Sequence, residues 1–185
     1  MSGPLSHIKV LDLSRVLAAP WAAQNLADLG AEVIKVERPI KGDDSRAFAP
    51  PFLKDEYGND TSEAAYYLSA NRNKRSIEVD LASPEGIKLV KDLAKHCDVL
   101  VENFKVGGLS QYGLDYASMK DEFPHLIYCS ITGFGQTGPF ADRPGYDFMI
   151  QGMGGLMSIT GERDGLPGAG PQKAGVAVTD IITGM

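Results

Sequence analysis

A strand–helix–strand pattern in residues 8–38 constrains the fold of this chain more than any other feature of its sequence. Apolar residues run from Ile8 to Leu13, and helical spacing follows once Pro20 has marked a helix start. A second apolar run at 33–36 then predicts a parallel strand reached by a right-handed crossover. The first loop, SRVLAAP, lacks the G-x-G-x-x-G of dinucleotide-binding folds. We therefore expect a ligand here, but not a nicotinamide cofactor bound in the usual way.

The alternation of strands and helices continues along the chain. Residues 76–81 alternate as a strand, Ser83, Pro84 and Glu85 start a helix, and 98–102 form the next strand. A short helix at 116–122 and a strand at 126–132 follow more loosely. This pattern predicts an α/β fold, a Rossmann-like, doubly wound and mostly parallel sheet with helices on both faces.

Two segments do not follow this alternation. Residues 39–66 form a long polar connection rich in proline, glycine and aspartate, and a connection of that length is typical of a functional or a disordered segment. From Gly133 the chain becomes glycine-rich, and the apolar stretch 176–185 resembles the start of a helix. A helix of roughly three turns needs partners to be stable. We therefore expect 1–185 to be the N-terminal portion of a larger domain, truncated after 185.

Composition excludes several classes of function. A net charge of −6 argues against nucleic-acid binding, and no apolar run is long enough to cross a membrane or resembles a secretory signal. The two cysteines, Cys97 and Cys129, lie in apolar segments and predict small buried side chains in a reducing compartment. We therefore expect a cytoplasmic protein. The three histidines are scattered, so we expect no metal site.

Polar residues at predicted strand ends are the first candidates for ligand binding. Arg38 ends the second strand, where a guanidinium can meet a phosphate, although a pair with Glu37 or Asp43 is equally consistent with the sequence. Glu37 could alternatively hold a ribose hydroxyl. Asn103 and Phe104 end the fourth strand, and an amide beside an aromatic face suits an adenine as well as a packed turn.

Three further segments could contribute to ligand binding or catalysis, and each also has a purely structural interpretation. The basic run at 71–75 could steer an anion or form a solvated turn, and the glycine loop at 133–139 lacks the residues of a P-loop. Asp180 stands near a helix start in GVAVTDIITG. The helix dipole and backbone N–H groups would favour its charged form, so we expect an ionised carboxylate, as for any first-turn acid.

Eight segments in order resemble the class III coenzyme A transferases, the family that includes formyl-CoA and carnitine CoA-transferases. They are VLDLSRVLAAP, DLGAEVIKVERP, GDDSR, NRNKRSIEVDL, DVLVENF, SITGFGQTGP, GYD and GVAVTD. The resemblance covers nearly the whole chain but only the N-terminal part of the family's longer sequence. Each segment is weak alone, and together they are specific.

The resemblance implies roles for individual residues. Asp180 matches the family's nucleophile, Arg38 a contact of the CoA phosphates, and Tyr146 a residue near the thioester. Other positions match residues that line the CoA site: Val16, Ala18, Val79, Asn103 and Phe104.

The implied activity is an acyl-CoA:carboxylate CoA-transferase that works through an aspartyl anhydride and an aspartyl-CoA thioester on Asp180. CoA enters as acyl-CoA substrate, with a small carboxylic acid as second substrate and no tightly bound cofactor. The family's interlocked dimers imply a homodimer. The motif set is nearest to members that use dicarboxylic acids such as succinate.

Departures from the family's patterns leave alternatives open. Leu17 replaces a glutamine of the formyl-CoA enzymes, and Gln111 stands where a basic CoA contact is common. The related α-methylacyl-CoA racemases carry a histidine where this chain has Tyr146, so a two-base proton transfer lacks its second base. A CoA-binding chain without catalytic activity is the other alternative.

Overall fold

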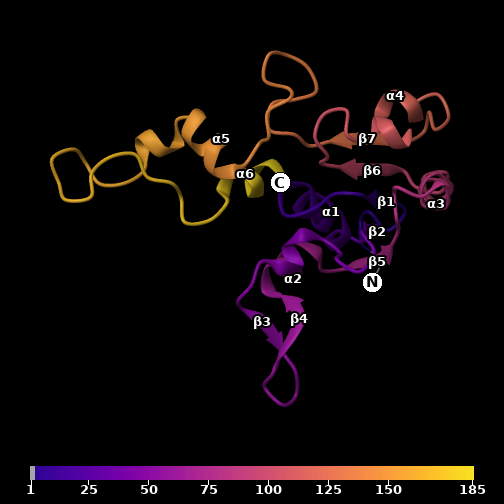
Figure 1. Cartoon of the computed structure of the whole chain (residues 1–185), viewed down its shortest axis with the longest axis horizontal. Coiled ribbons are helices and arrows are strands. Elements are labelled where there is room, and N and C mark those ends of the chain that lie inside the picture. The colour runs from indigo at the N-terminus through magenta and orange to yellow at the C-terminus, as the bar shows by residue number, and fades with distance from the viewer. Residues whose placement is uncertain (1–2) are drawn as a thin grey trace.

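A five-stranded parallel sheet forms the centre of the computed structural model, which describes residues 3–185 (Figure 1). The strand order is β5-β2-β1-β6-β7, so the order reverses between β1 and β6. The strands are β1 (Lys9–Asp12), β2 (Glu32–Glu37), β5 (Lys74–Glu78), β6 (Val99–Glu102) and β7 (Ile127–Ser130). The predicted parallel α/β sheet is thus confirmed, and its carboxyl-terminal edge at the reversal is where such folds bind ligands.

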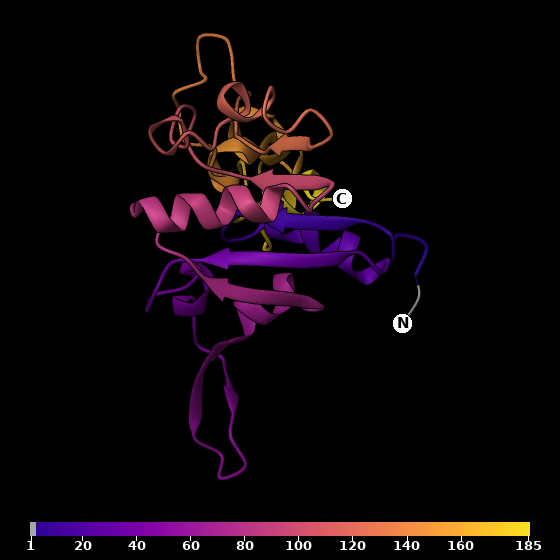
Figure 2. The ribbon, with the colours of Figure 1, turned by 90° about the vertical axis from the view of Figure 1, so that its right-hand side faces the viewer.

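Helices cover both faces of the sheet, as the sequence predicts (Figure 2). On one face, α1 (Ala18–Asp28) packs its alanines against Val10, and on the other, α3 (Pro84–Ala94) packs Val90 against Leu11. Neighbouring residues of β1 thus point into two different cores, because side chains alternate along a strand. Burial on both faces explains the short apolar runs in the central strands, Val10–Leu11 in β1 and Val99–Val101 in β6.

Local sequence signals set the ends of the main helices. The Ser83 hydroxyl accepts the Gly86 N–H at 3.0 Å and caps α3, as predicted. Gly86 packs so tightly that an added Cβ would stand 1.9 Å from the Asp80 carbonyl oxygen. Gly30 follows α1 with φ +101°, a left-handed conformation that is typical of the glycine that ends a helix.

The connection at 39–66 has more structure than its polar composition indicated. It contains the 3-10 turn η1 (Asp44–Ala47) and a hairpin of β3 (Phe52–Lys54) and β4 (Asp60–Ala64), which projects from the body (Figures 1 and 2). Helix α2 (Ala65–Asn71) then leads into β5, which begins and ends earlier than predicted, so that Val79 lies just beyond it.

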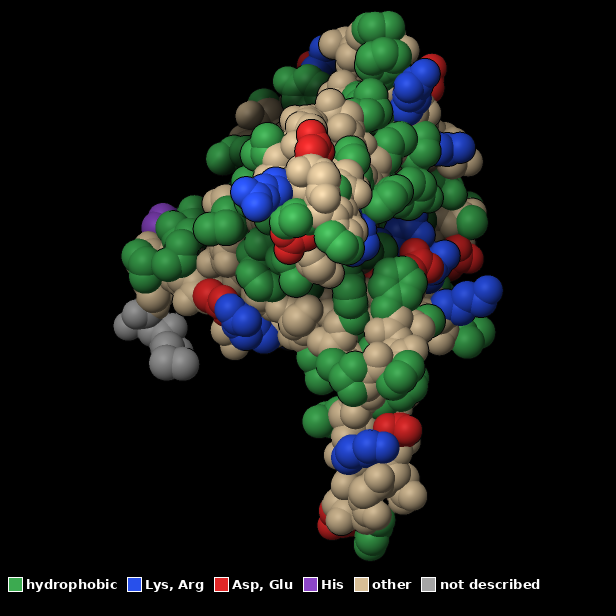
Figure 3. All heavy atoms as spheres, turned by 90° about the vertical axis from the view of Figure 1, so that its left-hand side faces the viewer, with side chains coloured by type: hydrophobic (Ala, Val, Ile, Leu, Met, Phe, Trp, Pro, Cys, Tyr) green, Lys and Arg blue, Asp and Glu red, His purple; other side chains and the backbone are tan. Residues whose placement is uncertain are grey.

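The glycine-rich part beyond residue 133 forms short helices joined by loops. They are α5 (Asp147–Met153), η3 (Leu156–Ile159) and α6 (Val178–Thr183). Two further short elements, η2 (Ser110–Tyr112) and α4 (Tyr116–Met119), lie between β6 and β7. Helix α6 packs on α1, where Asn25 Nδ2 donates to the Gly184 carbonyl at 3.0 Å. Phe148, Ile159 and Ile182 are exposed, and Figure 3 shows hydrophobic side chains over much of this side of the molecule.

Within residues 3–185, no helix is long and apolar enough to cross a membrane, and no three potential metal ligands lie together.

Candidate active site

The loop after β1 is fastened to the loop after β6 at the reversal of strand order. Asn103 accepts the Arg15 N–H on Oδ1 at 2.9 Å and donates from Nδ2 to the Arg15 carbonyl at 2.7 Å. These two hydrogen bonds use part of the bonding capacity of the Asn103 amide and hold the first loop in place. Contact of Asn103 with an adenine stays a prediction.

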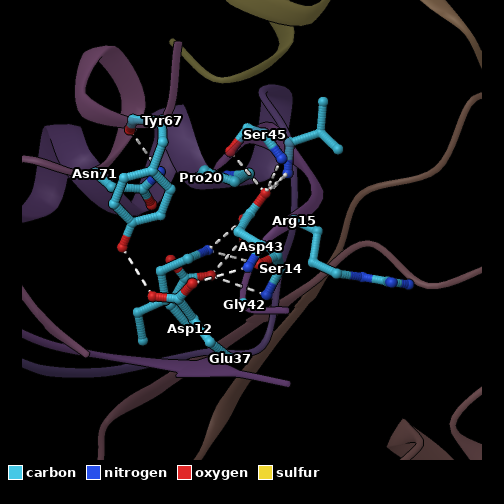
Figure 4. A network of polar contacts seen from close by, with 12 residues as sticks. Asp12, Ser14, Arg15, Pro20, Glu37, Gly42, Asp43, Ser45, Tyr67 and Asn71 are labelled. Carbon is cyan, nitrogen blue, oxygen red and sulfur yellow. Dashed lines mark hydrogen bonds and ion pairs between the residues drawn. The ribbon is translucent and has the colours of Figure 1, made fainter. Parts of the chain in front are cut away.

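A buried ion pair also supports this loop, as part of the network of polar contacts in Figure 4. Lys35 Nζ lies 2.8 Å from an Asp43 oxygen, both side chains are fully buried, and Lys35 also donates to the Ser14 carbonyl at 2.8 Å. Asp43 Oδ1 accepts the Val16 N–H at 3.1 Å. Val16 has φ +71°, a left-handed conformation that is costly for a β-branched residue. The buried pair thus helps to hold a strained loop residue.

The basic run at 71–75 makes structural ion pairs rather than a ligand-steering surface. Lys74 Nζ is buried and contacts Asp12 at 2.9 Å and the Pro20 carbonyl at 2.8 Å. Burial lowers the pKa of Lys74 in spite of Asp12. Arg72 pairs with Asp28 on α1, and Arg75 pairs with Glu32 on β2.

Glu37 is the acceptor at the centre of a second buried network. Arg46 donates to it at 2.8 and 2.9 Å, the Tyr67 hydroxyl at 2.8 Å and the Ser76 hydroxyl at 2.5 Å. Burial works to raise the pKa of Glu37, but these donors bring it down to about 2. With its oxygens so occupied, Glu37 is neither the partner of Arg38 nor a free acceptor for a ribose.

A pocket of about 230 Å³, here called the Arg38 pocket, opens at the carboxyl-terminal ends of β2 and β5. Arg38, Val79 and Phe104 line it together with Arg15. The Arg38 guanidinium pairs with Asp44, not with the predicted Glu37 or Asp43. The pocket combines an apolar wall with a half-exposed cation.

A second pocket of about 370 Å³, the Asp180 pocket, lies beside the first. It is lined by the remaining predicted site residues: Val16, Ala18, Asn103, Tyr146 and Asp180. Arg15 and Phe104 line both pockets, with the Arg15 guanidinium carbon 5.0 Å from the Phe104 ring centroid. The eight residues singled out in the sequence therefore surround two pockets that share a wall.

The Asp180 carboxylate is half-buried at the start of α6, next to a second carboxylate. Asp147 accepts the Thr179 N–H at 2.8 Å and the Asp180 N–H at 3.4 Å, and Gln151 Nε2 donates to it at 2.6 Å. Burial, followed by the charge of Asp147, raises the pKa of Asp180 to about 6. The expected stabilisation of its charged form by the helix is thus outweighed. At pH 7 the carboxylate remains largely ionised and is more basic than an ordinary aspartate.

Several residues of the site were not predicted. Arg15, Lys105, Arg143 and Asp147 line the Asp180 pocket, and Asp147 could have been found because it follows Tyr146 in GYD. Tyr66, on the unpredicted helix α2, has its pKa raised by burial and by nearby carboxylates, of which Asp180 contributes most.

The two departures from the family's pattern occupy different places. Leu17 lines the Asp180 pocket and is buried. Gln111 donates from Nε2 to the Gly108 carbonyl at 2.9 Å and lines neither pocket.

The chain is similar to known proteins over nearly its whole length. Residues 5–185 match CoA-transferase family III. The chain belongs to this family. It is 60% identical to the succinate–glutarate CoA-transferase of Agrobacterium fabrum, over 98% of this chain and 44% of that protein. It is 53% identical to the human succinyl-CoA:glutarate CoA-transferase, over 98% of this chain and 39% of that protein.

The fold of this family III chain is also found in solved structures. A CAIB/BAIF family protein from Brucella suis superposes with a TM-score of 0.91 and 56% identity, covering 100% of this chain and 47% of that one. The chain thus spans less than half the length of the relatives described here. The resemblance seen in the sequence is confirmed at the level of family and fold.

Proposed function

We propose that this chain carries the CoA-binding and nucleophile-bearing part of an acyl-CoA:carboxylate CoA-transferase. One observation carries the proposal: a half-buried carboxylate of raised pKa, Asp180, lies in a pocket that shares a wall with the pocket of Arg38. A ligand with a phosphate-bearing end and a reactive end fits two such pockets, and acyl-CoA is a ligand of that kind.

The two pockets suggest the direction in which CoA lies. Arg38 would contact its phosphates, because a guanidinium matches phosphate geometry. Val79 and Phe104 would form the apolar wall beside the adenine. The pantetheine arm would then pass Val16 and Ala18 and bring the thioester to Asp180, near Tyr146.

The proposed reaction needs only carboxylates and the CoA thiolate. An Asp180 oxygen attacks the thioester carbonyl, the C–S bond breaks, and a mixed anhydride forms as CoA thiolate leaves. The thiolate attacks the aspartyl carbonyl, giving an aspartyl-CoA thioester and the free donor acid. The acceptor carboxylate then attacks this thioester, and the released thiolate takes the acyl group from the new anhydride. Asp180 is regenerated with no net change in protons or electrons.

Asp180 is suited to this role by its surroundings. A carboxylate is a weak nucleophile, and one that is more basic yet still ionised is a better one. A pKa of about 6 meets both conditions near pH 7. Partial burial also removes competing water from the reacting carbonyl.

The acyl groups that we propose are short dicarboxylic acids such as succinate and glutarate. Relatives at 60% and 53% identity are named for these acids. The buried Leu17 in the wall of the Asp180 pocket replaces a polar contact with an apolar one, which disfavours oxalate and formate.

The alternatives have weaker support. A racemase needs a second base, and His7, His96 and His125 line neither pocket. A binding protein without catalytic activity has no evident use for a carboxylate of raised pKa.

Mass spectrometry of the covalent intermediate tests the proposal. Incubation with succinyl-CoA should leave a CoA-sized adduct on the chain, and Asp180→Ala should abolish it. Asp142→Asn is the matched control, because Asp142 lines the same pocket without a proposed role. An adduct that survives in Asp180→Ala would refute the assignment. CoA binding without any adduct in the unaltered chain would favour the binding protein.

A further inference from the structure

Asp44 bridges the two arginines of the Arg38 pocket. Its Oδ2 lies 3.3 Å from Arg15 Nη1, and its Oδ1 is paired with Arg38 Nη2. Arg15 comes from the loop after β1 and Arg38 from the end of β2, so the two cations stand at the edge of adjacent strands. One carboxylate thus occupies the position between two guanidinium groups.

The fold gives Asp44 no other task. The neighbouring Asp43, not Asp44, caps η1 by accepting the Ser45 N–H at 2.9 Å. Within residues 3–185, the hydrogen bonds of the Asp44 carboxylate all come from these two arginines. Asp44 can therefore lose its charge without loss of a cap or a core contact.

A phosphate bound in the Arg38 pocket would need the same two guanidinium groups that Asp44 occupies. Both arginines line the Arg38 pocket, and Arg15 also lines the Asp180 pocket, on the path between them. On the basis of the proposed function, we propose that Asp44 is an internal competitor of the CoA phosphates. It holds Arg15 and Arg38 in place in the empty site and is displaced when the ligand's phosphate binds between them.

Because the three side chains are partly exposed, this exchange costs little free energy. The side chains of Arg15, Arg38 and Asp44 are 32%, 46% and 43% exposed. Ion pairs with this exposure contribute little to stability, so a doubly charged phosphate can replace the carboxylate. Asp44 then lowers the affinity for CoA modestly and speeds its release, which suits a substrate that must leave after each transfer.

The test compares four chains for binding of CoA and of inorganic pyrophosphate by calorimetry. Asp44→Asn should bind both ligands about two- to fivefold more tightly than the unaltered chain. Asp28→Asn is the control, because it makes the same change of net charge at an exposed pair with Arg72, whose residues do not line the Arg38 pocket. It should leave both affinities unchanged. Adding Arg38→Met to Asp44→Asn should remove the gain in affinity for both ligands.

The outcomes separate this inference from the proposed function. Affinity of Asp44→Asn that equals or falls below that of Asp28→Asn would overturn the role of Asp44, as would pyrophosphate binding by none of the chains. Failure of the unaltered chain to bind CoA would overturn the proposed function, while the pyrophosphate comparison would still decide the role of Asp44.

Discussion

The Arg38 pocket and the Asp180 pocket share a wall but are built in different ways. The first opens at the ends of β2 and β5, strands whose side chains pack into the sheet's cores. The second is lined on one side by residues 131–133 and 141–146 of the loop between β7 and α5, and by residues of the short helices α5 and α6. Tyr146, in that wall, is 72% exposed, whereas Val79 in the first pocket is 5% exposed.

The comparison shows where each pocket obtains its rigidity. The Arg38 pocket rests on buried pairs such as Lys35–Asp43, in which neither charge reaches solvent and which also hold Val16, on the side of the Asp180 pocket formed by the first loop. The wall of the Asp180 pocket around Asp180 rests on hydrogen bonds that one carboxylate, Asp147, accepts from the N–H groups of Thr179 and Asp180 at the start of a short helix. Substitutions beneath the first pocket should therefore affect the whole fold, and those in the second mainly the chemistry.

Removal of one partner of the buried pair should have the largest effect. Lys35→Met leaves the Asp43 carboxylate buried without a counter-charge, so we expect a loss of about 3–5 kcal/mol in the free energy of unfolding. Urea denaturation measures this loss, with Lys88→Met at the exposed pair with Asp92 as control. The control should change stability by less than about 0.5 kcal/mol. A small loss in Lys35→Met would contradict the contrast between the two pockets.

Loss of the cation should have a smaller effect, confined to ligand binding. Arg38→Met removes charge-assisted hydrogen bonds to phosphate, so the affinity for CoA should fall about 10- to 100-fold with little change in stability. Arg75→Met is the control, because Arg75 pairs with Glu32 near the amino-terminal ends of β5 and β2, away from the Arg38 pocket. Equal losses in both variants would indicate a general charge effect and would remove Arg38 from the site.

The strand that leads to the Arg38 pocket was easier to predict from the sequence than the elements around the Asp180 pocket, and packing explains why. A strand buried on both faces is mostly apolar, so Val33, Ile34 and Val36 are visible as a pattern that ends before Arg38, although Lys35 between them is buried in an ion pair. The ion-pair partner of Arg38 could not be predicted in this way. Glu37, Asp43 and Asp44 are all acidic residues close to it in the sequence, and only the tertiary contacts show which one pairs with it.

The Asp180 pocket depends on elements without such a pattern. Helices α2 and α5 are each seven residues long, too short to show a clear helical period. The carboxyl group that faces Asp180 comes from residue 147, far away in the sequence. For this reason the pKa of Asp180 was expected to follow its helix, whereas burial and Asp147 determine it.

The smallest predicted effect concerns the charge of Asp147. The ionised form of Asp180 is the proposed nucleophile, so adduct formation should fall as pH drops through about 6. Asp147→Asn keeps an acceptor oxygen for the Thr179 N–H but removes the negative charge, so the midpoint should move to lower pH, by less than about one unit. Single-turnover rates measured between pH 4.5 and 8 would record the shift.

Two controls distinguish a charge effect from a structural one. Asp142→Asn alters a carboxylate that lines the same pocket but does not contribute to the shift at Asp180, so its profile should match that of the unaltered chain. Arg38→Met should weaken CoA binding without moving the midpoint, because Arg38 lies in the other pocket. An unchanged midpoint in Asp147→Asn would mean that burial alone raises the pKa. The two carboxylates would then be neighbours in structure only, and the Asp180 pocket would owe its chemistry to desolvation.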